Sequence, residues 1–320
     1  MEVIDITQPR WKQNTFLGRF KHFTELTHPK HMFHSSNRLN KADKIISGYK
    51  SGEDNSLQKL SIKEQWRIKY IYDSAFHPDT GDKMLLPFRM CAQIPSAILI
   101  VSGILTYHHT LSGVLFWQWF NQSYCATLNF TNRNATSKVT NKHILMAYTS
   151  ATTGAVAVSV LLNRMVTTTH SLSGRLVPFL AITMANAINI PLMRQNELKD
   201  GVTVSTEGGE SCGSSRRAAA VGIFQTLLGR LVFAGPSFIF SPIIYTRLIR
   251  HFPILHASKS LSIIIQGLLT GLLYIPSIPL GCSLFPQRSH LSVNSLEHNV
   301  KQCVQRKHPN AKYVYFNKGL

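Results

Sequence analysis

Two side-chain amides and a proline within an apolar run are the residues in this sequence best suited to binding chemistry. Asn186, Asn189 and Pro191 occupy the second half of the eighteen uncharged residues 176–193. The asparagines are three residues apart, so they share one face of a helix. Pro191 cannot donate a backbone hydrogen bond, which leaves a carbonyl one turn earlier without its helical partner. Amides beside a freed carbonyl could bind a small polar solute; alternatively, they join neighbouring helices and the proline marks the helix end.

Other candidate binding residues lie in two further apolar segments. Thr152, Thr153 and Asn163 could line a path for a hydroxylated solute, or their small polar side chains could let helices pack closely. Arg230 places a charge inside an apolar segment, where it costs several kcal/mol unless it faces protein or reaches the interface. It could meet a substrate carboxylate, or it could be an interface anchor or an interhelical partner.

Enzymatic chemistry has little support in the sequence. The run His77-Pro-Asp-Thr-Gly81 brings a histidine and an aspartate together, but no nucleophile or second base lies near it in sequence. The five cysteines are scattered and form no C-x-x-C pair, which disfavours a disulfide framework and a zinc site. No glycine-rich phosphate-binding motif is present. We therefore predict a protein that is not an enzyme and has no metal site and no cofactor.

The elements that must position these residues are long apolar segments. Eighteen helical residues cover about 27 Å, close to the thickness of a bilayer core. The pattern predicts an all-α transmembrane protein with about five spans, near residues 94–115, 144–162, 176–193, 218–245 and 262–284. Together they form a transmembrane domain over 94–286, between a polar region 1–93 with short helices and a basic tail 287–320. An odd number of spans would place the two ends of the chain on opposite sides.

The net charge of +19 invites a nucleic-acid function, but its distribution argues against one. Residues 1–93 carry fifteen Lys/Arg and ten Asp/Glu, and only five acids follow Asp82. The excess therefore reflects a lack of acids around the apolar segments, which suits a membrane protein among anionic lipids. We expect a lipid bilayer and a small solute as partners, and no nucleic acid.

The polar regions carry local signals of their own. Ser61 and Glu64 form a capping box, and the helix after it either lies on the membrane surface or belongs to a packed helical cap. Asn40 or Asp43 could begin an earlier helix that ends at Gly52. The glycine-rich connector after residue 200 has the composition of a loop.

Motifs along the whole chain resemble the sideroflexin family. They are His77-Pro-Asp-Thr-Gly81, Phe116-Trp-Gln-Trp-Phe-Asn-Gln-Ser123, Thr131-Asn-Arg-Asn134, Ala151-Thr-Thr-Gly154, Asn189-Ile-Pro-Leu-Met-Arg194, Leu284-Phe-Pro-Gln287 and Phe316-Asn-Lys-Gly-Leu320. Pro9-Arg-Trp11 and Tyr70-Ile-Tyr-Asp-Ser-Ala-Phe76 match as well. The resemblance is greatest to the serine-transporting mitochondrial members.

The resemblance implies a multi-span protein of the mitochondrial inner membrane that carries serine into the matrix for one-carbon metabolism, with alanine and cysteine as further substrates. It also implies an N-terminus toward the intermembrane space and a tail in the matrix. Two single residues depart from the family pattern, and the family's usual acidic turn reads Thr206-Glu-Gly-Gly209. Cys125 stands where asparagine is usual, and Leu161 replaces a glycine, an exchange that would push two helices apart at a contact. The alternative function is a non-transporting scaffold or assembly factor, or a diverged copy with reduced transport.

Overall fold

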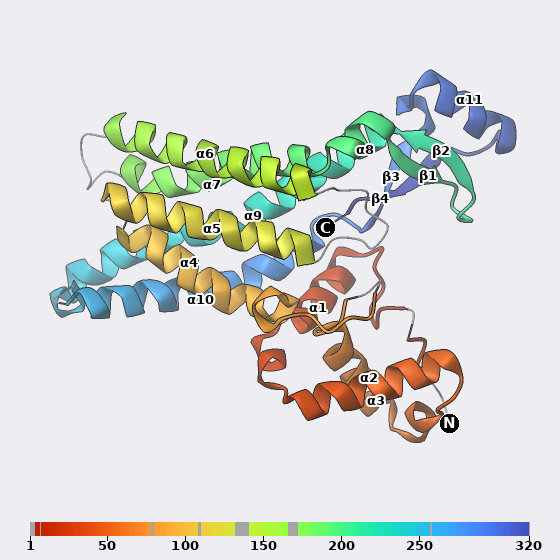
Figure 1. Cartoon of the computed structure of the whole chain (residues 1–320), viewed down its shortest axis with the longest axis horizontal. Helices are drawn as coiled ribbons and strands as arrows, with labels where there is room; N and C mark the ends of the chain where they lie inside the picture. The colour runs from red at the N-terminus through yellow and green to blue at the C-terminus, as the bar shows by residue number, and fades with distance from the viewer. Residues whose placement is uncertain are drawn as a thin grey trace.

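The chain is described by a computed structural model over residues 4–6, 8–77, 80–107, 110–131, 141–165, 172–256 and 258–319. The described residues are mainly helical, which confirms the predicted class, and they add one small sheet. Figure 1 shows a bundle of long helices, with a helical N-terminal region and the sheet both lying at one end of it.

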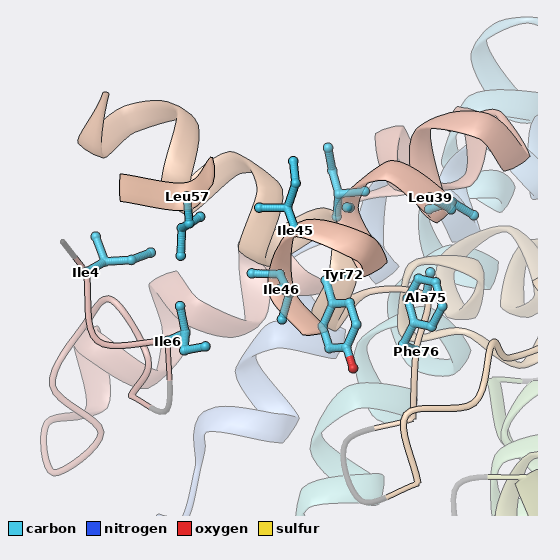
Figure 2. Packing of buried hydrophobic residues seen from close by; sticks show 11 residues of the cluster. Ile4, Ile6, Leu39, Ile45, Ile46, Leu57, Tyr72, Ala75 and Phe76 are labelled. Carbon is cyan, nitrogen blue, oxygen red and sulfur yellow. The ribbon is translucent and has the colours of Figure 1, made fainter. Parts of the chain in front are cut away.

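The N-terminal region forms a packed unit around a hydrophobic core of its own. Its helices are α1 (Phe16–Leu26), α2 (Ser36–Ser51) and α3 (Ile62–Asp73). Apolar side chains at helical spacing on α2 meet those at the end of α3 (Figure 2). The buried cluster comprises Ile4, Ile6, Leu39, Ala42, Ile45, Ile46, Leu57, Ile71, Tyr72, Ala75 and Phe76. Of the two alternatives for α3, this packing favours the helical cap.

The local helix signals of this region are largely confirmed. Ser61 and Glu64 form the predicted capping box at the start of α3, and Gly52 ends α2 in the left-handed conformation with φ of 77°. The predicted start of α2 was wrong, because Ser35 caps it and the helix begins at Ser36. Serine is among the strongest N-cap residues, and it lies five residues before the asparagine considered above.

The bundle contains six long helices within the described residues. They are α4 (Gln93–Tyr107), α5 (Leu111–Thr131), α6 (Asn141–Met165), α7 (Leu172–Met193), α9 (Arg216–His251) and α10 (Lys259–Ser283). The expected segment 94–115 is thus divided between α4 and α5. The hydroxyl of Thr110 accepts a bond from the Gly113 amide at 3.2 Å and so begins the new helix. This helix runs back beside α4 (Figure 1).

The helices have the length and composition of a membrane protein. Among the described residues, α4 with the turn before it, α9 and α10 are long and apolar enough to cross a bilayer, and α6 and α7 contain shorter apolar stretches. Large apolar side chains also point outward from the bundle, as expected of surfaces in contact with lipid. Examples are Leu99, Leu115, Phe116, Leu145, Leu180, Phe224, Phe240, Leu268 and Leu272.

The prolines of α9 do not break it. Pro236 and Pro242 both lie inside a single helix of 36 residues. Ser237, Phe238 and Ser241 around them are buried against neighbouring helices. Packing within a helical bundle can hold a proline-containing helix together, since neighbouring helices compensate for the missing backbone bond.

The sheet joins two regions far apart in sequence. After α8 (Gln195–Asp200), the strands β1 (Val202–Ser205) and β2 (Ser211–Ser215) form a hairpin in the connector. The tail supplies β3 (Arg288–Ser292), α11 (His298–Lys307) and β4 (Tyr313–Asn317). The strands are antiparallel in the order β2-β1-β4-β3. The prediction of a loop-like connector was therefore wrong, because its strands depend on pairing with residues about 110 positions away.

Both ends of the chain lie at the same end of the bundle. Helix α1 packs against the end of α10, where Arg19 Nε donates to the carbonyl of Ser283 at 2.8 Å. The sheet lies at this end too (Figure 1). The expectation of opposite ends rested on five spans, and the division at Tyr107 adds one more crossing of the bundle.

Candidate functional site

Close packing of α6 on α7 brings the predicted hydroxyl and amide residues near one another. A Cβ atom at Gly154 would lie 2.5 Å from Cδ1 of Ile188, so the two helices approach closely there. Ile188 lies between the two asparagines in sequence, and Gly154 directly follows Thr153. The candidate residues of α6 and α7 therefore come level with each other.

The two asparagines differ in burial. Asn189 is 4% exposed, whereas Asn186 is only half-buried. Pro191 lies in the last turn of α7, which ends two residues later at Met193. The proline therefore marks the helix end, as one of the two alternatives held, and it also leaves the Ala187 carbonyl without a helical partner. Asn189 is consequently a buried amide beside backbone that can accept a further bond.

Helix α9 brings Arg230 to the same level. At the end of α7, Arg194 Nη1 donates to Thr226 Oγ1 at 3.4 Å, one turn before Arg230. Further along α7, Phe179 lies 3.8 Å from the position of a Cβ at Gly235. These two contacts fix an antiparallel register, in which Asn186 and Asn189 lie along the stretch of α9 that carries Arg230.

The half-buried Arg230 has thiols and another cation among its neighbours. Its guanidinium is close enough to interact electrostatically with Cys125 of α5, Cys282 of α10 and Arg194. The backbones of α9 and α10 nearly touch one residue earlier, where a Cβ at Gly281 would lie 2.5 Å from the Gly229 carbonyl oxygen. Arg230 thus faces the protein interior rather than lipid, as its cost at bilayer depth requires.

The predicted residues of α6 are less well placed. Thr152 Oγ1 donates to the Tyr148 carbonyl at 2.7 Å, so its hydroxyl proton is used by its own helix. Thr153 is exposed. Asn163 belongs to α6 but lies nine residues beyond Gly154, about 13 Å along a helix. Its side chain is outside the described part of the chain. The α7–α9 register therefore places Asn186, Asn189 and Pro191 at the level of Arg230.

Sequence reasoning missed two buried cations at this end of the bundle. Lys318 and Arg19 are each 6% exposed. Lys318 Nζ donates to the Phe285 carbonyl at 3.3 Å, and Arg19 bonds the last turn of α10. Burial lowers the pKa of Lys318, and its neighbours Arg19 and Arg194 lower it further. Helix C-termini attract cations, so the end of α10 could have suggested such partners.

Arg19, Arg194 and Lys318 lie close enough to interact electrostatically, and we call them the cation cluster. Arg194 also pairs with Glu197 through Nε at 3.0 Å. The segments that form the six long helices contain no aspartate or glutamate. No group of three metal-ligating side chains occurs among the described residues. The arrangement is suited to receiving a carboxylate at Arg230 and leaves an ammonium group to neutral oxygens.

The whole sequence matches one family. The sequence profile of the sideroflexins covers residues 5–320. The chain belongs to the sideroflexin family. Sideroflexin-1 of Rattus norvegicus and of Homo sapiens are each 44% identical to it, over 99% of this chain and 98% of theirs. Sideroflexin-1-3 of Drosophila melanogaster is 40% identical over the same shares. No solved structure matches this sideroflexin.

The two departures from the family pattern have different settings in this sideroflexin. Leu161 is 60% exposed, so its side chain points away from the bundle and does not separate two helices as predicted. Cys125 lies within electrostatic range of Arg230. A thiol is a weaker hydrogen-bond acceptor than an amide oxygen, so the exchange weakens one possible partner of the guanidinium.

Proposed function

We propose that the protein carries small zwitterionic amino acids, serine first among them, across the mitochondrial inner membrane into the matrix, where serine feeds one-carbon metabolism. Alanine and cysteine are further substrates, since they share the zwitterion and the small size. The chain acts as a carrier and not as an enzyme. The single observation that carries the proposal is that Arg230 of α9 lies level with the buried Asn189 of α7, in helices whose segments contain no aspartate or glutamate.

Charge balance supports a carboxylate as the ligand of Arg230. A cation inside an apolar bundle is stabilised when an anion reaches it, and the bundle segments offer no acidic side chain. The cation cluster of Arg19, Arg194 and Lys318 would raise the local concentration of carboxylates at this end of the bundle. The Asn189 amide and the carbonyl freed by Pro191 would then orient the bound solute.

The ammonium group of the substrate would be held by neutral oxygens. Acidic partners are unnecessary for a small cation when several carbonyl or hydroxyl oxygens converge on it. A neutral site also avoids trapping the substrate, because the ammonium must leave again on the other side. Movement of the helices about their proline and glycine positions would expose the site alternately to the two compartments.

Uptake of labelled serine by proteoliposomes tests the proposal. Vesicles containing the protein should accumulate serine faster than empty vesicles, and unlabelled alanine should compete. Ethanolamine, which is serine without its carboxylate, should not compete, because the carboxylate is the group that Arg230 recognises. Uptake no faster than that of empty vesicles would refute transport.

A scaffold or assembly role is the second candidate. The packed N-terminal unit has a core of its own and exposes Phe33, which is 85% accessible and available to a partner protein. Under this alternative, Asn186→Ala and Asn189→Ala would leave function intact, whereas deletion of residues 1–75 would abolish it. Rescue of serine uptake in cells that lack related transporters separates the two candidates. If the protein is a carrier, the two asparagine variants should fail to rescue uptake; if it is a scaffold, they should rescue it.

A further inference from the structure

Among the serine and threonine hydroxyls of the bundle that have a hydrogen-bond partner, most donate to a backbone carbonyl of their own helix. A serine or threonine in an apolar helix usually donates to the carbonyl one turn earlier, which satisfies the hydroxyl without any neighbour. Among the described residues of the long helices, eight do so: Ser123, Thr127, Thr149, Thr152, Thr226, Thr246, Ser277 and Ser283. This pattern is the background against which exceptions stand out.

Among the described residues, five buried hydroxyls on α4, α9 and α10 are exceptions; one is Thr106 near the end of α4, and the other four form a group. The Oγ atoms of Ser102, Ser237 and Ser241 and Oγ1 of Thr270 are inaccessible and have no hydrogen-bond partner among the described residues. Ser102 is 5% exposed and the other three are fully buried. An unpaired buried hydroxyl costs about 1–3 kcal/mol. Four unpaired hydroxyls in one region therefore destabilise the packed bundle at a place where a polar solute would satisfy them. We call these four residues the hydroxyl seam.

The four hydroxyls lie at one level of the bundle. Tyr245 Oη donates to Ser262 Oγ at 2.9 Å, which fixes the antiparallel register of α9 and α10. Ser237 lies eight residues before Tyr245, and Thr270 lies eight residues after Ser262, so the two come level. Ser241 follows Ser237 by one turn on the same face of α9.

Helix α4 completes the seam from its own side. The Oγ atom of Ser102 lies 3.4 Å from the position of a Cβ at Gly267, which is three residues before Thr270 on α10. Residues next to the seam in sequence, such as Val101 and Phe238, belong to one hydrophobic cluster, which also includes Ile182 of α7. The seam therefore lies in an apolar part of the bundle.

We propose that the hydroxyl seam is a second binding station on the route of the substrate, which takes the ammonium and hydroxyl end of a small amino acid after it leaves Arg230. This inference rests on the proposed function. Hydroxyl oxygens accept bonds from an ammonium group and hydroxyl protons donate to a substrate hydroxyl, so the seam fits serine at that end. The helices must separate to admit it, because a Cβ at Gly271 would already lie 2.7 Å from Ile98 Cδ1.

Introduced cysteines test whether the seam meets water and substrate. Ser241→Cys and Thr270→Cys are made in the full chain, with Ser277→Cys as the matched control. Ser277 lies on α10, as Thr270 does, and is similarly buried, but its hydroxyl donates to the Leu273 carbonyl at 2.6 Å. Proteoliposomes are treated with a charged methanethiosulfonate, and labelling at each introduced cysteine is read by mass spectrometry.

Labelling at positions 241 and 270 should be at least about tenfold faster than at position 277, and saturating serine should slow it. Equal labelling at the three positions would overturn the seam as a wetted surface. Fast labelling that serine leaves unchanged would overturn it as a binding station. Serine uptake by the unaltered chain is measured in parallel, so loss of transport itself is distinguished from failure of the seam alone.

A second set of variants covers the case in which a cysteine variant does not fold. Thr270→Val and Ser241→Ala should raise the KM for serine about fivefold, the value of one neutral hydrogen bond, while thermal stability stays equal or rises. A purely structural hydroxyl would show the opposite, with unchanged KM and lower stability. That result would overturn the proposal.

Discussion

The α5–α6–α7 group and the α4–α9–α10 group of the bundle use their polar residues in opposite ways. The first looks the more polar in sequence, yet Thr149 and Thr152 bond backbone carbonyls of α6 itself. The second is more apolar, yet it holds five buried hydroxyls without a partner among the described residues: Ser102, Thr106, Ser237, Ser241 and Thr270. The α5–α6–α7 group contributes two such atoms, Gln118 Oε1 and Thr183 Oγ1. The number of polar residues in a helix therefore does not locate a solute path; their pairing does.

The two groups also differ in how closely their helices pack at glycine positions. In the α4–α9–α10 group, glycine backbones meet directly, and a Cβ at Gly281 would lie 2.5 Å from the Gly229 carbonyl oxygen and 2.8 Å from Phe233 Cβ. In the α5–α6–α7 group, Gly154 meets only the flexible end of Ile188. The first contact is rigid because backbone cannot move aside, and the second can adjust by a side-chain rotation.

The largest difference should appear on filling these two glycines. Gly281→Ala should destabilise the protein by about 3 kcal/mol, since the new methyl group collides with backbone. Gly154→Ala should cost less than about 1 kcal/mol, because Ile188 can rotate. Thermal unfolding in nanodiscs measures both variants. Equal losses would contradict the distinction between a rigid and an adjustable contact.

Little acid sensitivity should arise in either group, because their helices contain no aspartate or glutamate and their only histidines in sequence are His143 near the start of α6 and His251 at the end of α9. It should arise in the N-terminal region, where burial, reinforced by Lys30, lowers the pKa of His31 to about 4 from its ordinary 6.5. A lowered histidine pKa means that the folded state disfavours the proton. Its contribution to stability is therefore complete above pH 6.5 and is lost progressively as the pH falls toward 4.

Hydrogen exchange read by mass spectrometry measures this effect locally. Amides of α1 and α2 should exchange faster at pH 4.5 than at pH 7, after correction for intrinsic rates, while those of α9 and α10 should not. His31→Gln should reduce the difference but not abolish it, since burial also lowers the pKa of His22 and His34. A neutral amide can still donate to the Glu25 carbonyl that His31 contacts at 3.1 Å. An unchanged pH dependence in this variant would assign the effect to another group.

A paired hydroxyl should matter for stability where an unpaired one does not. Gln118 Nε2 donates to Ser159 Oγ at 3.2 Å between α5 and α6. Ser159→Ala should cost about 1 kcal/mol, because it leaves a buried amide without its partner. Ser237→Ala should be neutral or stabilising. A larger loss of thermal stability for Ser237→Ala than for Ser159→Ala would contradict the distinction between paired and unpaired hydroxyls.

The smallest effect is expected at Thr152. Its hydroxyl is bonded to the Tyr148 carbonyl, so Thr152→Val should leave the KM for serine within about twofold of the original, by the modest value of one backbone-bonded hydroxyl. Uptake assays decide this. A larger rise in KM would restore Thr152 to the binding site that the sequence proposed.

Much of the fold could be predicted from local patterns, and most of what was missed depends on distant contacts. The capping box at Ser61 and the apolar segments of α6, α7, α9 and α10 are encoded within single stretches. The strands β1 and β4 are short and pair across the chain, so no local pattern marks them. The division of α4 from α5 was missed because an apolar sequence continues on both sides of it.

The candidate site could be predicted only in part for the same reason. Asn189 and Arg230 stand out because amides and charges are costly in apolar segments. Arg19 and Lys318 come from the two ends of the chain and meet only through folding at the end of α10. The pairing state of a hydroxyl cannot be derived from its type, so Thr152 and Thr270 look alike in sequence.

The central claim is that Arg230 receives the carboxylate of a small amino acid, and one pair of variants tests it most directly. Arg230→Gln is compared with Arg247→Gln, an exposed arginine near the other end of the same helix. Initial rates of serine uptake should fall at least about tenfold for Arg230→Gln, the loss expected for a hydrogen bond to a charged group, and stay within about twofold for Arg247→Gln. Undiminished uptake by a folded Arg230→Gln variant would contradict the claim.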